Sequence, residues 1–155
     1  MAPDRKPARL SRRAVVSAPA LLAVVLLRRP AGAAPALMEA AIRDFTGHAP
    51  VSPGKVRLEI PPLVENGNTV PVTITVESPM APDRHVRAIA LFNGGNPQPN
   101  VITARLGSRS GRAVLSTRMR LATSQRVVAV AEMSDGTFWS DSAEVVVTLA
   151  ACVES

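Results

Sequence analysis

The residue best suited to covalent chemistry is Cys152, the only cysteine among the 155 residues. The last plausible strand ends near Leu149, which leaves residues 150–155 (AACVES) as a tail too short to bury its side chains well. Chain ends are usually accessible, although a lone cysteine is most often a small buried hydrophobe. A thiolate can form S–S bonds reversibly. Cys152 is therefore a candidate for covalent attachment, for an intermolecular disulfide, or for an incidental free thiol.

The other reactive side chains form no recognisable active site. His48 and His85 are isolated in turn-like surroundings, so we expect plain surface or structural histidines. The sequence has no glycine-rich phosphate-binding motif, no clustered metal ligands, no distinctive pair of carboxylates and no nucleophile–base set. We therefore expect a protein without an active site of its own, without a cofactor and without a bound metal.

The first 33 residues have the three parts of an export signal. Basic residues end in Arg12-Arg13, an apolar run follows over residues 14–27, and small residues then offer cleavage after Ala33 or Ala36. The apolar run is shorter than the ~20 residues that a membrane-spanning helix needs, so a cleaved signal fits better than an anchor. The arginine pair resembles a twin-arginine signal. We expect a periplasmic protein that is free of the membrane after cleavage.

The net charge of +6 lies entirely within residues 1–33, which hold seven basic residues and one acid. Residues 132–155 carry five acids and no basic residue. Residues 84–131 carry no acid and eight arginines: Arg84, Arg87, Arg105, Arg109, Arg112, Arg118, Arg120 and Arg126. This arginine-rich stretch is either a set of solvated strand faces or a docking surface that steers acidic partners. Nucleic acid is disfavoured, because the protein is exported and lacks an aromatic platform for stacking bases.

A short amphipathic helix is predicted over residues 36–45. Its apolar side chains fall on one stripe at helical spacing: Leu37, Met38, Ala41, Ile42 and Phe45. Gly47 is placed to end this helix.

After Gly47 the hydrophobic period changes to two, which predicts short strands. They are expected over residues 55–60, 69–76, 86–92, 101–106, 112–120, 126–133, 137–140 and 143–149. Turn residues separate them, including Asn66-Gly67 in the turn over residues 65–68. Pro71 suggests that its strand starts at a sheet edge. Seven or eight such strands indicate an all-β, immunoglobulin-like β-sandwich with one helix in front.

Several sequence blocks occur in an informative order. They are residues 65–72 (ENGNTVPV), 78–80 (SPM), 110–113 (SGRA), 127–132 (VVAVAE) and 134–139 (SDGTFW). Together with the C-terminal cysteine, these blocks resemble the SoxY family, the sulfur-carrier subunit of the periplasmic thiosulfate-oxidising (Sox) system. The resemblance runs from about Leu37 to Cys152.

The resemblance implies an immunoglobulin-like sandwich that forms a heterodimer with a second β-sandwich subunit, SoxZ. It also implies a C-terminal arm whose cysteine tethers pathway intermediates while partner enzymes act on them in turn. These partners are a c-type cytochrome that loads thiosulfate, a hydrolase that removes sulfate, and a dehydrogenase that oxidises the outer sulfur. Cys152 is the only residue onto which the attachment role transfers.

The arm departs from the pattern that the resemblance implies, which is typically Gly-Gly-Cys-Gly-Gly. Here Ala150, Ala151 and Val153 flank the cysteine, and Glu154 adds charge after it. Glycine permits positive φ and close backbone approach within a narrow partner site, and alanine and valine lose much of that freedom. No basic residue is near Cys152 in sequence to lower its pKa, so we expect the partner's active site to activate the thiol.

The sequence is thus interpreted as three segments: an export signal over residues 1–33, a SoxY-like domain over 37–149, and a carrier arm over 150–155. The expected function is covalent transport of sulfur intermediates in thiosulfate oxidation. The alternative is a non-covalent immunoglobulin-like interaction module, or a disulfide-linked structural dimer, in the periplasm. The arm sequence leaves open which partners accept it and which sulfur species it carries.

Overall fold

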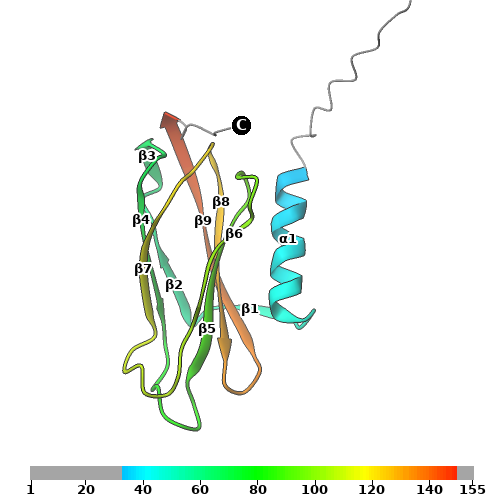
Figure 1. Ribbon diagram of the computed structural model, residues 1–155, viewed down its shortest axis with the longest axis vertical. Coiled ribbons are helices and arrows are strands. Elements are labelled where there is room, and N and C mark those ends of the chain that lie inside the picture. The colour runs from blue at the N-terminus through cyan, green and yellow to red at the C-terminus, as the bar shows by residue number, and fades with distance from the viewer. Residues whose placement is uncertain (1–32, 150–155) are drawn as a thin grey trace, which may run out of the picture.

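The computed structural model describes residues 33–149. The predicted export signal, apart from its last residue, and the predicted arm with Ala150, Ala151, Cys152 and Val153 lie outside these residues. The described part has three layers, which are a three-stranded sheet, a larger six-stranded sheet and a helix over the outer face of the larger sheet (Figure 1). The expected immunoglobulin-like sandwich with one N-terminal helix is therefore confirmed.

The elements follow in chain order. They are α1 (Ala33–Thr46), β1 (Val51–Pro53), β2 (Val56–Glu59), β3 (Leu63–Asn66), β4 (Val70–Val76), β5 (Val86–Asn93), β6 (Asn100–Arg105), β7 (Val114–Met119), β8 (Gln125–Met133) and β9 (Phe138–Leu149). The large sheet has the order β1-β9-β8-β5-β6, and β3 also pairs with β9. The small sheet has the order β2-β4-β7. Strand β9 is the last element, so it determines where the predicted arm leaves the sandwich.

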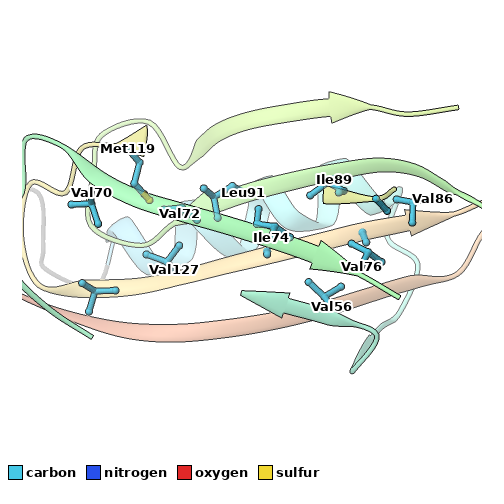
Figure 2. Packing of buried hydrophobic residues seen from close by; sticks show 14 of the residues in the cluster. Val56, Val70, Val72, Ile74, Val76, Val86, Ile89, Leu91, Met119 and Val127 are labelled. Carbon is cyan, nitrogen blue, oxygen red and sulfur yellow. The ribbon is translucent and has the colours of Figure 1, made fainter. Parts of the chain in front are cut away.

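The main hydrophobic core lies between the two sheets. Alternate residues of β4 point into it, because successive side chains of a strand point to opposite faces. Their partners across the core come from β5 and β8. Figure 2 shows this packing for Val70, Val72, Ile74 and Val76 of β4 with Ile89, Leu91 and Val127.

The helix α1 closes a second core against the large sheet. Met38 is 2% exposed and packs with Phe92, Val128 and Phe138. The ring of Phe45 meets those of Phe92 and Phe138 edge-on, with centroids 5.9 and 6.0 Å apart.

The bounds of α1 differ slightly from the prediction. The helix ends at Thr46, before Gly47 at φ +59°, as expected. It begins at Ala33 rather than Ala36. Pro35 is tolerated in the first turn, because proline lacks a backbone N–H and an N–H at this position would have no partner within the helix. The predicted apolar stripe is not buried throughout, because the Leu37 side chain is 45% exposed. Leu37 is turned about 100° from its neighbour Met38, which takes the inward position.

Nine strands form within residues 33–149, rather than seven or eight. The prediction missed β1 and β3, which have only three and four residues and pair in parallel with β9. The segments expected at 137–140 and 143–149 form one strand, β9. Its polar residue Asp141 does not interrupt the strand, because its Oδ2 accepts a hydrogen bond of 2.8 Å from the Leu58 backbone N–H of β2.

The prediction from Pro71 that its strand starts at a sheet edge is confirmed. This strand lies in the middle of the small sheet, between β2 and β7. However, β2 pairs only with residues 73–76 of β4. At Pro71 the strand therefore has a single neighbour, β7, and a missing N–H is tolerated on the unpaired side.

Candidate functional site at the root of the C-terminal arm

The end of β9 is the root of the predicted arm, and neighbouring elements hold it on two sides. Strand β3 runs parallel to it, with Leu63 opposite Val146 and Asn66 opposite Leu149. On the other side, the Val147 backbone N–H donates to Ser124 Oγ at 2.9 Å. The strand is thus fixed almost to its last residue.

The turn after β3 fastens the root to the β7–β8 connection. The Gly67 N–H donates to the Leu149 carbonyl at 2.9 Å, and the Gly67 carbonyl accepts from the Leu121 N–H at 2.8 Å. Asn66 Oδ1 accepts from the Asn68 N–H at 3.0 Å and stabilises the turn. The block 65–72, which is one of those that resemble the SoxY family, therefore anchors the last described residue.

Covalent geometry limits how far Cys152 can lie from this root. Cys152 follows Leu149 by three positions in the chain. A fully extended chain spans at most about 3.3–3.6 Å per residue, so the Cα atoms of these two residues are at most about 10–11 Å apart. Any protein that acts on the Cys152 thiol must therefore come close to the residues around Leu149.

A cavity of about 750 Å³ opens at the same end of the sandwich. One wall is the start of α1, with Leu37 and Met38. The opposite wall is formed by the β5–β6 loop around Gly95, by residues 123–126 before and within β8, and by Glu144 of β9. Since Ser124 also hydrogen-bonds to Val147, the cavity lies beside the root.

A buried polar network supports the loops around this cavity. Asn96 Oδ1 accepts from the Gln125 side-chain amide at 2.9 Å and from the Ala122 N–H at 2.9 Å. Gln125 Oε1 accepts from the Gly95 N–H at 2.7 Å, and Asn93 Oδ1 accepts from the Asn96 N–H at 2.9 Å. Residues 93–97 lie between two predicted strands, where the sequence indicates only a connection. Their side chains in fact hold the β5–β6 loop against the start of β8.

Exposed large apolar side chains gather around the root. Among the described residues five are conspicuous, and they are Leu37 (45% exposed), Leu63 (60%), Val114 (42%), Val146 (53%) and Leu149 (62%). Leu63 and Val146 are paired neighbours whose strand neighbours Val64 and Val145 point into the core, so both face outward. Leu37 lines the cavity together with Glu144, two residues before Val146. We call Leu37, Leu63, Val146 and Leu149 the apolar collar.

Sequence reasoning missed the apolar collar and the cavity. Residues 61–68 read as a proline break followed by a turn, which concealed β3 and its Leu63. The exposure of Val146 depends on which face of β9 this residue occupies, and the apolar stripe of residues 36–45 does not show that its member Leu37 is exposed. No sequence pattern carries these facts, because they follow from pairings between segments far apart in the chain.

The eight arginines of residues 84–131 are all exposed. Three of them have an acidic partner within 4 Å, namely Arg84 with Asp83, Arg87 with Glu132, and Arg126 with Glu39. Five belong to the end where β5 begins and β6 finishes, away from the root: Arg84, Arg87, Arg105, Arg109 and Arg112. Their exposure is compatible with both solvated faces and a docking surface, so the docking hypothesis stays a prediction.

The two histidines are structural or surface residues, as expected. His48 is exposed with φ +66°, and its N–H donates to the Arg43 carbonyl at 2.9 Å, which caps α1. His85 is half-buried, and its Nδ1 lies 3.3 Å from the Ala81 carbonyl oxygen. Within residues 33–149, no three His, Cys, Asp or Glu side chains are grouped to hold a metal ion.

The block 134–139 forms the turn from which β9 starts. Asp135 Oδ1 accepts hydrogen bonds from Thr137 Oγ1 at 2.7 Å and from the Thr137 N–H at 2.9 Å. These bonds favour the carboxylate and lower the pKa of Asp135 below its ordinary value. Trp139 Nε1 donates to Thr137 Oγ1 at 3.0 Å, and Lys55 Nζ lies 4.2 Å from the Trp139 ring centroid. This block therefore organises the end of the sandwich opposite the root.

The geometry defines a class of protein, which is an immunoglobulin-like β-sandwich with a helix over one sheet and a last strand that leads into a short C-terminal segment. In a comparison with protein families, residues 42–152 match the family described as "Sulfur oxidation protein SoxY". The chain belongs to the SoxY family of sulfur-carrier proteins. None of the curated proteins matches it in sequence.

Among solved structures, the chain is similar to the sulfur carrier protein SoxY from Chlorobium limicola f thiosulfatophilum. The identity is 27%, the match covers 72% of this chain and 96% of that chain, and the TM-score is 0.61. It is also similar to a superoxide reductase (neelaredoxin) from Ignicoccus hospitalis, at 17% identity, 61% and 80% coverage, and TM-score 0.54. A superoxide reductase from Nanoarchaeum equitans is 12% identical to this chain. The match covers 62% of this chain and 100% of that chain, and the TM-score is 0.53. At such identities the superoxide reductases show a shared fold alone.

The comparisons confirm the expected family, and with it a carrier protein of the Sox system. No helix within residues 33–149 is long and apolar enough to cross a membrane.

Proposed function

We propose that this protein carries sulfur intermediates of thiosulfate oxidation as covalent adducts of the Cys152 thiol. The observation that carries the proposal is the extent of the family match, which runs from residue 42 to residue 152 and so ends on the only cysteine. A supporting observation is that the Leu149 carbonyl, three positions before the thiol in the chain, accepts a hydrogen bond from the Gly67 N–H.

The chemistry needs only an accessible thiolate on this chain, because partner proteins supply the oxidant and the hydrolytic water. Conjugation joins the Cys152 thiolate to the outer sulfur of thiosulfate and forms Cys–S–S–SO₃⁻, while a c-type cytochrome accepts two electrons. Hydrolysis of this adduct then yields Cys–S–S⁻, sulfate and two protons. A dehydrogenase then oxidises the outer sulfur with oxygen from three water molecules, so that Cys–S–SO₃⁻ and six protons form, and the dehydrogenase takes up the six electrons and passes them to its own electron acceptor. The proposal thus assigns no active site to this chain.

The proposed partners follow from the same family relation. A SoxZ-like β-sandwich subunit forms the heterodimer, and the three partner enzymes bind transiently. The twin-arginine-like signal over residues 1–33 delivers the protein to the periplasm and is cleaved near residues 33–36. Ala150, Ala151 and Val153 flank the cysteine where glycine would permit positive φ, so the arm sequence bears on which partner sites accept it.

Intact-mass measurement of the protein purified from cells growing on thiosulfate tests the proposal. We expect mass increases that correspond to sulfur and thiosulfate adducts, that disappear on mild reduction, and that are absent from Cys152→Ser. Circular dichroism of Cys152→Ser should match the wild type, because the substitution exchanges one side-chain atom and both hydrophobic cores are formed within residues 33–149. An unmodified mass during turnover would contradict the carrier function, and a disulfide-linked dimer on non-reducing gels would favour the structural alternative.

A further inference from the structure

We infer that the apolar collar is the surface on which the enzymes that act on Cys152 dock, an inference that rests on the proposed carrier function. The collar consists of Leu37, Leu63, Val146 and Leu149 at the root of the arm. Its occupant is a partner enzyme with an apolar rim around the opening of its active site.

The first argument is the short reach of the arm. Since Cys152 lies at most about 10–11 Å from Leu149, a partner can enclose the thiol only if its surface closes over the collar. The partner's rim must therefore displace water from the side chains around the root, whichever reaction it catalyses.

The second argument is the composition of this surface. Four of the five large apolar side chains that the described residues expose belong to it, although this end of the sandwich is only part of the surface. Scattered exposed apolar residues are normal, but their concentration at one end of a molecule favours an interaction site. Leu63 and Val146 are paired neighbours across β3 and β9, and Leu37 lines the cavity whose opposite wall includes Glu144. Leu149 points to the opposite face of β9 from Val146, because it shares the face of Val145 and Val147.

The third argument distinguishes a transient enzyme from a permanent subunit. A subunit bound permanently over the collar would occupy the space that every enzyme needs in order to reach the thiol. The stable heterodimer must therefore use another face. Charged groups flank the collar, including Glu144 and the Arg126–Glu39 pair at 3.9 Å. An apolar centre with a polar rim is typical of protein interfaces.

The experiment measures conjugation of thiosulfate to Cys152 by the cognate thiosulfate-loading cytochrome, with the adduct quantified by mass spectrometry. Leu63→Thr and Val146→Thr keep strand-compatible side chains and remove apolar contact surface. Val114→Thr is the matched control, because Val114 is 42% exposed but lies at the far end of β7 on the other sheet. We expect kcat/KM to fall roughly five- to tenfold in each collar variant and to stay within about twofold in the control.

Two further measurements assign the cause. The rate at which Cys152 reacts with a small aromatic disulfide reagent needs no docking, so it should be unchanged in all variants, as should the Tm. Wild-type conjugation rates in the collar variants would overturn the inference. So would loss of the SoxZ-like subunit from these variants in size-exclusion chromatography, because the collar would then be the subunit interface. Absence of any adduct on the wild-type protein would overturn the carrier function itself, and the docking surface with it.

Discussion

At the scale of single residues, the end of the sandwich that bears the arm depends on side chains that allow close backbone contacts. Gly95 is one of them, since a Cβ at this position would lie 2.8 Å from Thr123 Cγ2 and 2.9 Å from Gln125 Cδ. Gln125 is unable to move away cheaply, because it is buried and its amide bonds to Gly95, Asn96 and Thr123. Glycine is therefore required at position 95 for packing, whatever its backbone angles.

Gly95→Ala is accordingly expected to lower the free energy of unfolding by about 1–3 kcal/mol, as overpacking of a fixed site does. Urea denaturation followed by circular dichroism measures this change. Gly107→Ala is the control, because a Cβ there meets nothing within 4 Å. The control should change stability by less than about 1 kcal/mol, in the stabilising direction. Equal losses in both variants would show that the Gln125 network adapts.

Asp135 gives the protein an acid-sensitive contact. Because two hydrogen bonds from Thr137 lower its pKa from an ordinary 3.8, the folded state binds the proton less well than the unfolded state. The stability from this group is therefore present above about pH 4 and is lost as the pH falls through the lowered pKa. Asp135→Asn should reduce the loss of Tm between about pH 5 and 2.5. Thr137→Val, which removes the shorter hydrogen bond, should remove part of the same effect. An acid dependence like that of the wild type in Asp135→Asn would contradict this assignment.

At the scale of elements, the period of the hydrophobic pattern predicted most of the strands. The sequence did not predict how the strands pair. Strands such as β4 and β8 were predictable, because burial of one face or of both leaves a local signal. Strands β1 and β3 were not, because their parallel pairing with β9 depends on residues more than 80 positions away. The predicted strands 137–140 and 143–149 leave out Asp141, whose partner, the Leu58 N–H, lies on another sheet. The root of the arm was foreseen near Leu149, but its cavity and collar are products of this distant pairing.

The helix α1 provides a direct test of which face it buries. Met38→Ala should lower the free energy of unfolding by about 2–4 kcal/mol, because Met38 is 2% exposed and fills the space against Phe92 and Phe138. Its neighbour Leu37 is 45% exposed, so Leu37→Ala should cost less than about 1 kcal/mol. Chemical denaturation of both variants compares the two positions. Similar losses would mean that α1 sits in a different rotation about its axis.

At the scale of the whole molecule, the two ends of the sandwich differ in character. The end where β9 finishes has the apolar collar, the cavity and the polar network of Gln125. The end where β9 begins has the Asp135 turn and five of the arginines from residues 84–131. Strand β9 spans twelve residues between them, which corresponds to about 35–40 Å. If partners dock at the collar, the five arginines at the other end of β9 are too far away to contact the part of a partner that lies near the thiol.

This separation predicts the outcome of removing charge at the far end. The double substitution Arg109→Gln and Arg112→Gln should leave kcat/KM for thiosulfate conjugation within about twofold of the wild type at an ionic strength of about 0.15 M. The reason is that a Debye length of about 8 Å screens charges over so large a distance. The Tm should also change little, because both arginines are exposed. A loss of more than about fivefold would mean that an acidic partner surface extends along the whole sandwich to the β6–β7 loop. An unchanged rate, together with slow collar variants, would assign partner recognition to the arm end and leave these arginines as solvated residues.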